Sequence, residues 1–154
     1  MIRLETILTP GRSLANAPGG SKKRALEKVA ELIAKEVPEL DGQTVFEKLI
    51  AREKLGSTGF GNGIAIPHCR LEGCTTPVSA LLHLEAPIDY DAIDGAPVDL
   101  LFVLLVPAAA TDAHLELLRQ IASMLDRKEV RERLRAAPSR EALFPVVLDV
   151  QNEP

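Results

Sequence analysis

The chain has 154 residues, a length at which one hydrophobic core is the usual solution, so we expect a single domain over residues 1–154. Hydrophobic residues make up 46% of it and charged residues 26%, which excludes a disordered or coiled-coil protein. A net charge of −4 and an aromatic content of only 3% argue against nucleic acid or anionic lipid as a partner.

The apolar segments indicate the compartment. Residues 1–20 do not resemble a secretory signal, because Glu5 and Arg12 interrupt them. The longest apolar run, residues 100–106, is far shorter than the ~20 residues that a membrane-spanning helix needs. We therefore expect a cytoplasmic protein that does not insert into a membrane.

The first half of the chain predicts an irregular start and two helices. Prolines and glycines break up residues 1–20, so we expect only a short element at Leu4, Ile7 and Leu8 and then a loop. Ordered structure should begin at Ser21, the predicted N-cap of a helix that stops before Pro38. A capping-box pattern that starts at Thr44 predicts the second helix, which should end by Gly56.

Three apolar segments without helical periodicity predict strands. They are residues 64–67, residues 78–84, which lie between two prolines, and residues 98–106. The last is an unbroken apolar run, which is typical of a central strand covered by helices on both faces. The sequence therefore predicts a layered α/β domain.

Three further helices are predicted after that strand. The first should be entered through Thr111 or Asp112, and a shorter basic helix follows around residues 130–134. Ser139 is the predicted cap of the last helix. Pro145 lacks a backbone N–H, so we expect a kink or an early stop there.

Residues 56–63 are rich in glycine and join the second helix to a strand. Such a loop can approach a phosphate closely, but Asn62 and Gly63 stand where a nucleotide P-loop needs Lys and Ser or Thr. We therefore do not expect a nucleotide P-loop. A phosphate cradle of another kind and a simple glycine-rich turn both remain open.

Two histidines are candidates for chemistry. His68 directly follows Pro67 at the predicted end of a strand, where ligand sites of α/β sheets gather. His114 lies in the first turn of the helix after the buried strand, so we expect it at the same sheet edge. For both, the alternative is an ordinary hydrogen-bonded histidine. We interpret His83, within a strand, as structural or exposed.

We expect no metal and no cofactor. His68, Cys69, Cys74 and His114 are all residue types that bind zinc, but neighbouring residues of an extended chain point to opposite faces. The spacing of the two cysteines fits neither a zinc knuckle nor a disulfide framework, so we interpret them as free thiols.

The segment from Arg52 to His68, with GSTGFGNGIAIPH at its centre, resembles the phosphorylation-site segment of enzyme IIA proteins of the bacterial phosphotransferase system, fructose/mannitol type. Residues 21–26, 91–94 and 97–102 resemble the nitrogen-regulatory branch of that family. The resemblance covers residues 2 to 150. It implies a single α/β domain with a mixed central β-sheet and helices on both faces.

The resemblance also implies a site. His68 is the nucleophile that accepts a phosphoryl group from an HPr-like phosphocarrier protein, Arg52 stabilises the phosphoryl oxygens, and His114 supplies a hydrogen bond. Backbone N–H groups of the glycine-rich segment line the same hollow. The residues of this phosphate loop are Ser57, Thr58, Gly59, Gly61, Asn62 and Gly63. Cys69 departs from the small residue usual after the active histidine and raises the question of thiol chemistry there.

The implied function is a phosphohistidine carrier whose phosphorylation state regulates partner proteins such as transporters or kinases. One alternative is a sugar-specific IIA component that passes the phosphate to a separate IIB, and another is a binding module without phosphoryl chemistry. The oligomeric state stays open. An acidic set of residues belongs either to a partner interface or to a solvated loop: Glu85, Asp89, Asp91, Asp94 and Asp99.

Overall fold

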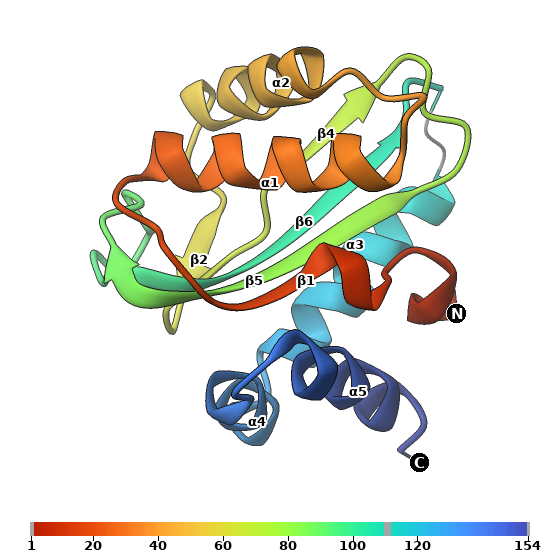
Figure 1. Ribbon diagram of the computed structural model, residues 1–154. Coiled ribbons are helices and arrows are strands. Elements are labelled where there is room, and N and C mark those ends of the chain that lie inside the picture. Colours follow the sequence, from red (N-terminus) through yellow and green to blue (C-terminus); the bar gives the residue numbers. More distant parts are fainter. Residues whose placement is uncertain (1, 110–111, 154) are drawn as a thin grey trace.

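The computed structural model describes residues 2–109 and 112–153, which form a six-stranded mixed sheet with helices on both faces. Helices α1 and α2 cover one face, and α3, α4 and α5 lie on the other (Figure 1). Their bounds are Lys22–Glu36, Gly42–Lys54, Asp112–Leu125, Lys128–Ala136 and Arg140–Gln151. The predicted fold class is confirmed. Thr111, one of the two predicted entry residues of α3, lies outside the described residues.

Strand β6 (Val98–Pro107) is the centre of the sheet. β5 pairs with one edge of it in antiparallel fashion, and β3 and then β4 pair with the other edge in parallel. β1 extends the sheet beyond β5, and β2 beyond β3. The bounds are Ser13–Ala17 for β1, Gly59–Gly61 for β2, Ile64–Ala65 for β3, His68–Leu71 for β4 and Val78–Ile88 for β5.

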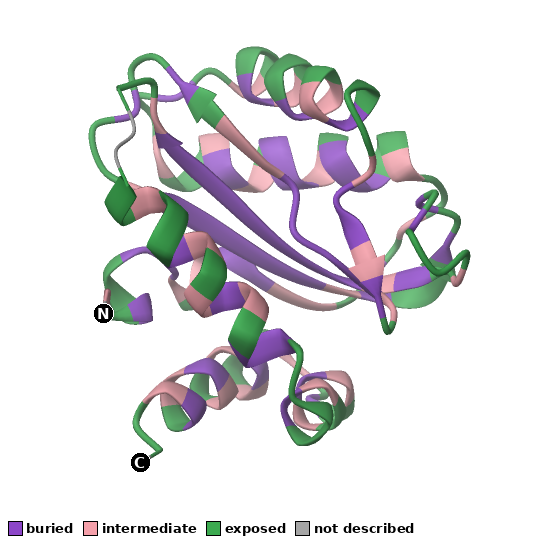
Figure 2. Ribbon diagram, turned by 180° about the vertical axis from the view of Figure 1, so that it is seen from behind, coloured by how far each residue is buried: buried purple, intermediate pink, exposed green. Residues whose placement is uncertain are grey.

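The unbroken apolar run of β6 is buried on both faces, as predicted (Figure 2). Successive side chains of a strand point to opposite faces. Leu101 and Leu105 accordingly belong to the core under α1 and α2, whereas Leu100 and Leu104 belong to the core under α3, α4 and α5. A polar residue at any of these positions would be buried without a partner.

Two helix starts show how capping determines the boundary. Ser21 caps α1 as predicted, and its hydroxyl accepts a hydrogen bond from Arg24 N. The prediction that α2 begins at Thr44 is wrong, because Asp41 is the cap and its carboxylate accepts from Thr44 N at 3.0 Å. Thr44 lies inside the first turn of α2, and its hydroxyl also donates to the Asp41 carboxylate.

Other predicted boundaries are also wrong. Ordered structure begins before Ser21, since residues 4–6 and 10–12 form short 3-10 helices and β1 follows them. β1 depends on pairing with the distant β5, which no local pattern reveals. β5 runs on to Ile88 rather than ending before Pro87, and α5 continues through Pro145 to Gln151 without the early stop. Within the described residues, no helix is long and apolar enough to span a membrane.

Arg12 joins the irregular start of the chain to the sheet and to α1. Its buried guanidinium donates to the carbonyl oxygens of Ser79 at 2.8 Å and Ile7 at 2.9 Å, and it pairs with Glu36 at 3.0 Å. Burial lowers the pKa of Arg12, an effect that Glu36 opposes. Where the N-terminal segment meets the sheet, backbone carbonyl groups without regular pairing therefore have a charged side chain as their partner.

We expect Arg12→Met to lower the free energy of unfolding by about 2–4 kcal/mol, because buried carbonyl oxygens and Glu36 lose their donor. Urea denaturation at neutral pH measures this. Lys23→Met, at an exposed position in α1, is the matched control and should change stability by less than about 0.5 kcal/mol. Equal stability of the two variants would contradict a structural role for Arg12.

Candidate functional site

His68 is the first residue of β4. The prediction that it follows the end of a strand is therefore corrected: the chain leaves β3, crosses Ile66 and Pro67, and pairs again with β6. Pro67 cannot donate, but its carbonyl oxygen accepts from Leu104 N at 2.9 Å, and His68 lies in register with Leu104. This pairing places the half-buried imidazole beside the carboxyl-terminal part of β6.

The hydrogen bond of the His68 ring determines its tautomer. Nδ1 lies 2.6 Å from the carbonyl oxygen of Ile66. A carbonyl oxygen can only accept, so in the neutral ring Nδ1 carries the proton and Nε2 carries the lone pair. The nitrogen that is free to react is therefore Nε2.

A pocket of 460 Å³ brings the three predicted catalytic residues together. Arg52, His68 and His114 all line it. β4 pairs only with β6 and so forms an edge of the sheet, where residues from both helical layers meet: Arg52 comes from α2 and His114 from α3. Asp112 and the apolar side chains of Leu104, Val106, Leu115 and Leu118 complete much of the wall.

Positive charge gathers at this pocket. Arg52 lies in the last turn of α2 and donates to the carbonyl oxygen of Gly56 at 2.9 Å, which holds its guanidinium at the helix end. Arg70, which sequence reasoning missed, also lines the pocket. In a strand, residues 68 and 70 point to the same face, so Arg70 could have been placed beside His68 from the sequence. It was missed because strand β4 was not predicted.

The residues of the predicted phosphate loop form a short strand and a tight turn. None of its six residues is among those that line the pocket. Gly59 and Gly61 belong to β2, which pairs with β3, and the hydroxyl of Ser57 donates to the carbonyl oxygen of Tyr90 at 2.7 Å. Asn62 and Gly63 have positive φ angles of 58° and 78°, as a tight turn requires. A role of this loop in binding phosphate stays a prediction.

Burial disfavours the thiolate form of both cysteines. Burial, followed by the neighbouring Cys74, raises the pKa of Cys69 to about 12 and outweighs the opposite effect of Lys48. Burial also raises the pKa of Cys74. Both cysteines are free, as predicted. Among the described residues, no three His, Cys, Asp or Glu side chains gather in a way that could hold a metal ion.

His83 is structural rather than part of the pocket. Its Nε2 lies 3.5 Å from Asp99 Oδ2, and Arg135 donates to the same carboxylate at 2.8–3.1 Å. Burial raises the pKa of Asp99, but the hydrogen bonds from His83 and Arg135 outweigh it and the pKa is lowered. Arg135 also donates to Asn62 O, so this cluster supports the β2–β3 turn.

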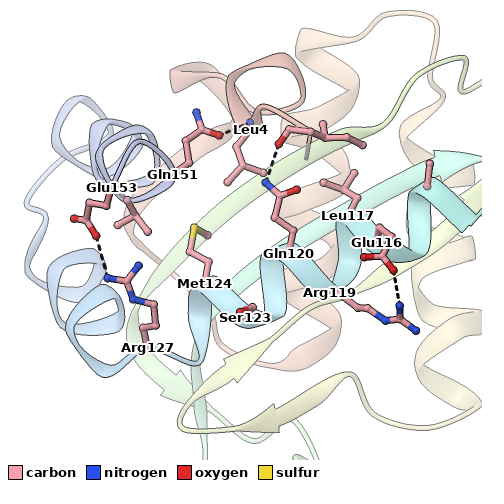
Figure 3. A pocket seen from close by; sticks show the side chains of 13 residues that line it. Leu4, Glu116, Leu117, Arg119, Gln120, Ser123, Met124, Arg127, Gln151 and Glu153 are labelled. Atoms are coloured by element: carbon pink, nitrogen blue, oxygen red, sulfur yellow. Dashed lines mark hydrogen bonds and ion pairs between the residues drawn. The ribbon is translucent and has the colours of Figure 1, made fainter.

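A larger pocket of 730 Å³ lies on the opposite face of α3 and contains none of the predicted catalytic residues (Figure 3). Most of its polar side chains are already paired. Gln120 donates to Ile2 O, Gln151 accepts from Leu4 N, and Arg127 pairs with Glu153. The smaller pocket is therefore the better candidate, because it alone of the two contains histidine side chains, and its two arginines, unlike Arg119 and Arg127 of the larger pocket, are in none of the ion pairs among the described residues.

Comparison with known families gives one clear result. The family model described as "Phosphoenolpyruvate-dependent sugar phosphotransferase system, EIIA 2" matches residues 6–149, so the chain belongs to this family. The resemblance noted in the sequence is thereby confirmed.

Relatives of known name extend this result. The "Nitrogen regulatory protein" of Pseudomonas aeruginosa is 75% identical over 152 residues, which cover 99% of each chain. The protein of that name from Escherichia coli (strain K12) is 47% identical over 154 residues, covering 99% of this chain and 94% of the relative. The nitrogen-regulatory resemblance is confirmed by these two relatives.

Solved structures agree with the fold. The nitrogen regulatory protein IIA-Ntr from Neisseria meningitidis superposes with a TM-score of 0.87 at 41% identity, covering 94% of this chain and 98% of that one. The mannitol IIA of Escherichia coli superposes with a TM-score of 0.73, covering 90% and 97%. At 19% identity, the second likeness concerns the fold alone.

We expect Cys69 to react slowly despite its place beside His68. A raised pKa lowers the thiolate fraction at any pH below it, so at pH 8 iodoacetamide should label native Cys69 at least roughly tenfold more slowly than the urea-unfolded chain. Peptide mass analysis follows each thiol, and a Cys74→Ser variant isolates Cys69. Equal rates in the folded and unfolded chain would contradict the protonated state.

Proposed function

We propose that the chain is a cytoplasmic phosphohistidine carrier that accepts a phosphoryl group on His68 Nε2 from an HPr-like donor and regulates partner proteins by its phosphorylation state. The observation that carries the proposal is the Nδ1 hydrogen bond of His68 to Ile66 O at 2.6 Å, in a pocket with two arginines. Together they direct a nucleophilic lone pair toward positive charge.

The proposed step is an in-line displacement. The Nε2 lone pair of His68 forms a bond to phosphorus while the bond from phosphorus to the donor imidazole breaks and its electron pair returns to that ring. Positive charge develops on the His68 ring, and the Nδ1–H bond to Ile66 O stabilises it. Arg52 and Arg70 stabilise the phosphoryl oxygens, and His114 supplies a further polar contact.

Exposed apolar side chains beside the pocket support a protein as the phosphoryl donor. Leu55, three residues after Arg52, is 85% exposed, and Leu115, which lines the pocket, is 48% exposed. We call this pair the apolar rim. In the proposed complex, the rim gives the donor protein contacts that release water around His68.

Regulation is favoured over sugar transport by the names of the relatives. Proteins called nitrogen regulatory protein match at up to 75% identity, whereas the fructose-specific EIIABC component of Bacillus subtilis matches at 29%, and this chain covers 23% of that relative. We propose transporters or kinases as the regulated partners. Phosphorylation of His68 adds a negative charge of about −1.5 to −2, which is enough to reorganise an interface with such a protein. The second candidate, transfer to a separate IIB, keeps the same site and adds one acceptor.

The phosphorylated residue is tested directly. Incubation with the general phosphotransferase enzymes and phosphoenolpyruvate should add one acid-labile, base-stable phosphoryl group to His68. Intact-mass and peptide analysis detect it. His68→Ala should gain none, whereas His83→Gln, a histidine outside the pocket, should be labelled like the parent chain. Equal labelling of His68→Ala would refute the proposal.

The supporting residues are tested by rate. We expect Arg52→Lys and His114→Ala to take up phosphate roughly 10- to 1,000-fold more slowly, because each removes oriented charge or a hydrogen bond from the transition state. Urea midpoints should stay close to that of the parent. Lys54→Ala, exposed in the same turn as Arg52, is the control and should keep the parental rate. Slow uptake accompanied by global unfolding would give the residue a structural role instead.

The two candidate acceptors are separated with the same phosphorylated protein. Transfer of the phosphoryl group to a purified sugar-specific IIB would favour the sugar-transport alternative. Retention on His68 in the presence of that IIB, with altered binding to a transporter or kinase, is the outcome expected of a regulator.

A further inference from the structure

Glu53 is the one acidic residue among the described residues that is buried. It follows Arg52 in the last turn of α2, but its side chain, 4% exposed, does not line the pocket. A buried carboxylate is costly unless it is paired and hydrogen-bonded, so a specific set of partners should explain its position.

Those partners are Thr58 and Lys22. Glu53 Oε1 accepts from Thr58 N at 3.1 Å and pairs with Lys22 Nζ at 2.9 Å, while Oε2 accepts a short hydrogen bond from the Thr58 hydroxyl. Lys22 Nζ also lies 4.5 Å from the centre of the Tyr90 ring. Thr58 is thus held at both its backbone N–H and its side chain.

The carbonyl group of Thr58 connects to the candidate nucleophile through hydrogen bonds of Ile66. The carbonyl oxygen of Thr58 accepts from Ile66 N at 3.1 Å, and the carbonyl oxygen of Ile66 is the acceptor for His68 Nδ1. The next carbonyl, of Pro67, is held by Leu104 N. The Ile66–Pro67 segment that orients the imidazole is therefore fastened to β6 at one end and, through Thr58, to Glu53 at the other.

We propose that Glu53 is a positioning residue that acts through Thr58 and Ile66 to hold His68 in the Nδ1–H tautomer, with Nε2 directed into the pocket. The proposal rests on the proposed function for the meaning of that orientation. It gives adjacent residues of α2 two separate tasks: Arg52 faces the pocket, and Glu53 maintains the backbone that aims the nucleophile.

The competing explanation is that Glu53 serves only as the partner of Lys22. The two explanations differ in what Thr58 does. If the ion pair alone matters, removal of the Thr58 hydroxyl should leave His68 unchanged. If the path through Thr58 matters, Glu53 and Thr58 should affect His68 alike, and Lys22 should affect stability without affecting the ring.

The experiment compares Glu53→Gln, Thr58→Val and their double variant with the parent chain. Thr58→Val keeps the shape and the backbone N–H and removes the hydroxyl. Thr58→Ser retains the hydroxyl and should behave like the parent chain. Glu47→Gln makes the same charge change at an exposed position of α2 and is the matched control. Lys22→Met removes the ion pair and leaves both Thr58 bonds.

Two readouts are needed. Nitrogen-15 NMR of the His68 ring reports the tautomer without any phosphorylation, and we expect a single Nδ1–H form in the parent and in Glu47→Gln but a mixture in Glu53→Gln and Thr58→Val. Phosphate uptake from the phosphorylated donor should slow roughly 10- to 100-fold in both variants. The double variant should be no slower than the slower single one, because both act on one path.

The outcomes separate this inference from the proposed function. An unchanged His68 tautomer in both Glu53→Gln and Thr58→Val, or a shift in Lys22→Met as large as theirs, would overturn the positioning role. Multiplied rate losses in the double variant would overturn it as well. If the parent chain takes up no phosphate, the proposed function fails, while the tautomer measurement still decides whether Glu53 orients His68.

Discussion

Backbone pairing along β6 is the constraint on which the rest of the structure depends. Because its side chains are apolar on both faces, β6 must lie between two helical layers, and both its edges must be paired. Pairing with β4 sets His68 opposite Leu104. The chain that leaves β6 enters α3, which carries His114, and α2 packs against β4 and brings Arg52. The pocket is thus a consequence of how one strand is completed.

Charged side chains stabilise the molecule where regular pairing is interrupted. Arg12 binds one carbonyl oxygen of the irregular N-terminal segment and one of β5, and the Asp99–Arg135 pair supports the β2–β3 turn. Glu53 does the same for the segment before β2. Each charge lies at a seam between elements and is matched by several hydrogen bonds, so its desolvation is compensated locally. Only the last of these seams leads to the candidate nucleophile.

Local patterns predicted what depends on local physics. Periodicity and capping predicted α1, and the apolar run predicted β6, because those signals are contained in consecutive residues. The resemblance to the enzyme IIA family indicated the chemistry of Arg52, His68 and His114, and one pocket contains all three. The strands β1 and β4 and the contacts of Glu53 were missed. They are defined by pairing between distant segments, and within the charged stretch around residue 53 nothing distinguishes an inward-facing acid from its exposed neighbours.

The apolar rim has a consequence for timing under the proposed function. Leu115 lines the pocket that contains His68, and Leu55 follows the pocket residue Arg52 by three positions, so a donor and a regulated partner that both use the rim compete for it. A bound partner would shield His68 from the donor. It would thereby slow the phosphorylation of His68, which is the step that releases the partner. The carrier would then respond to the donor only as fast as its partner dissociates, and the lifetime of that complex, rather than the chemistry at the imidazole, would set the delay of the signal.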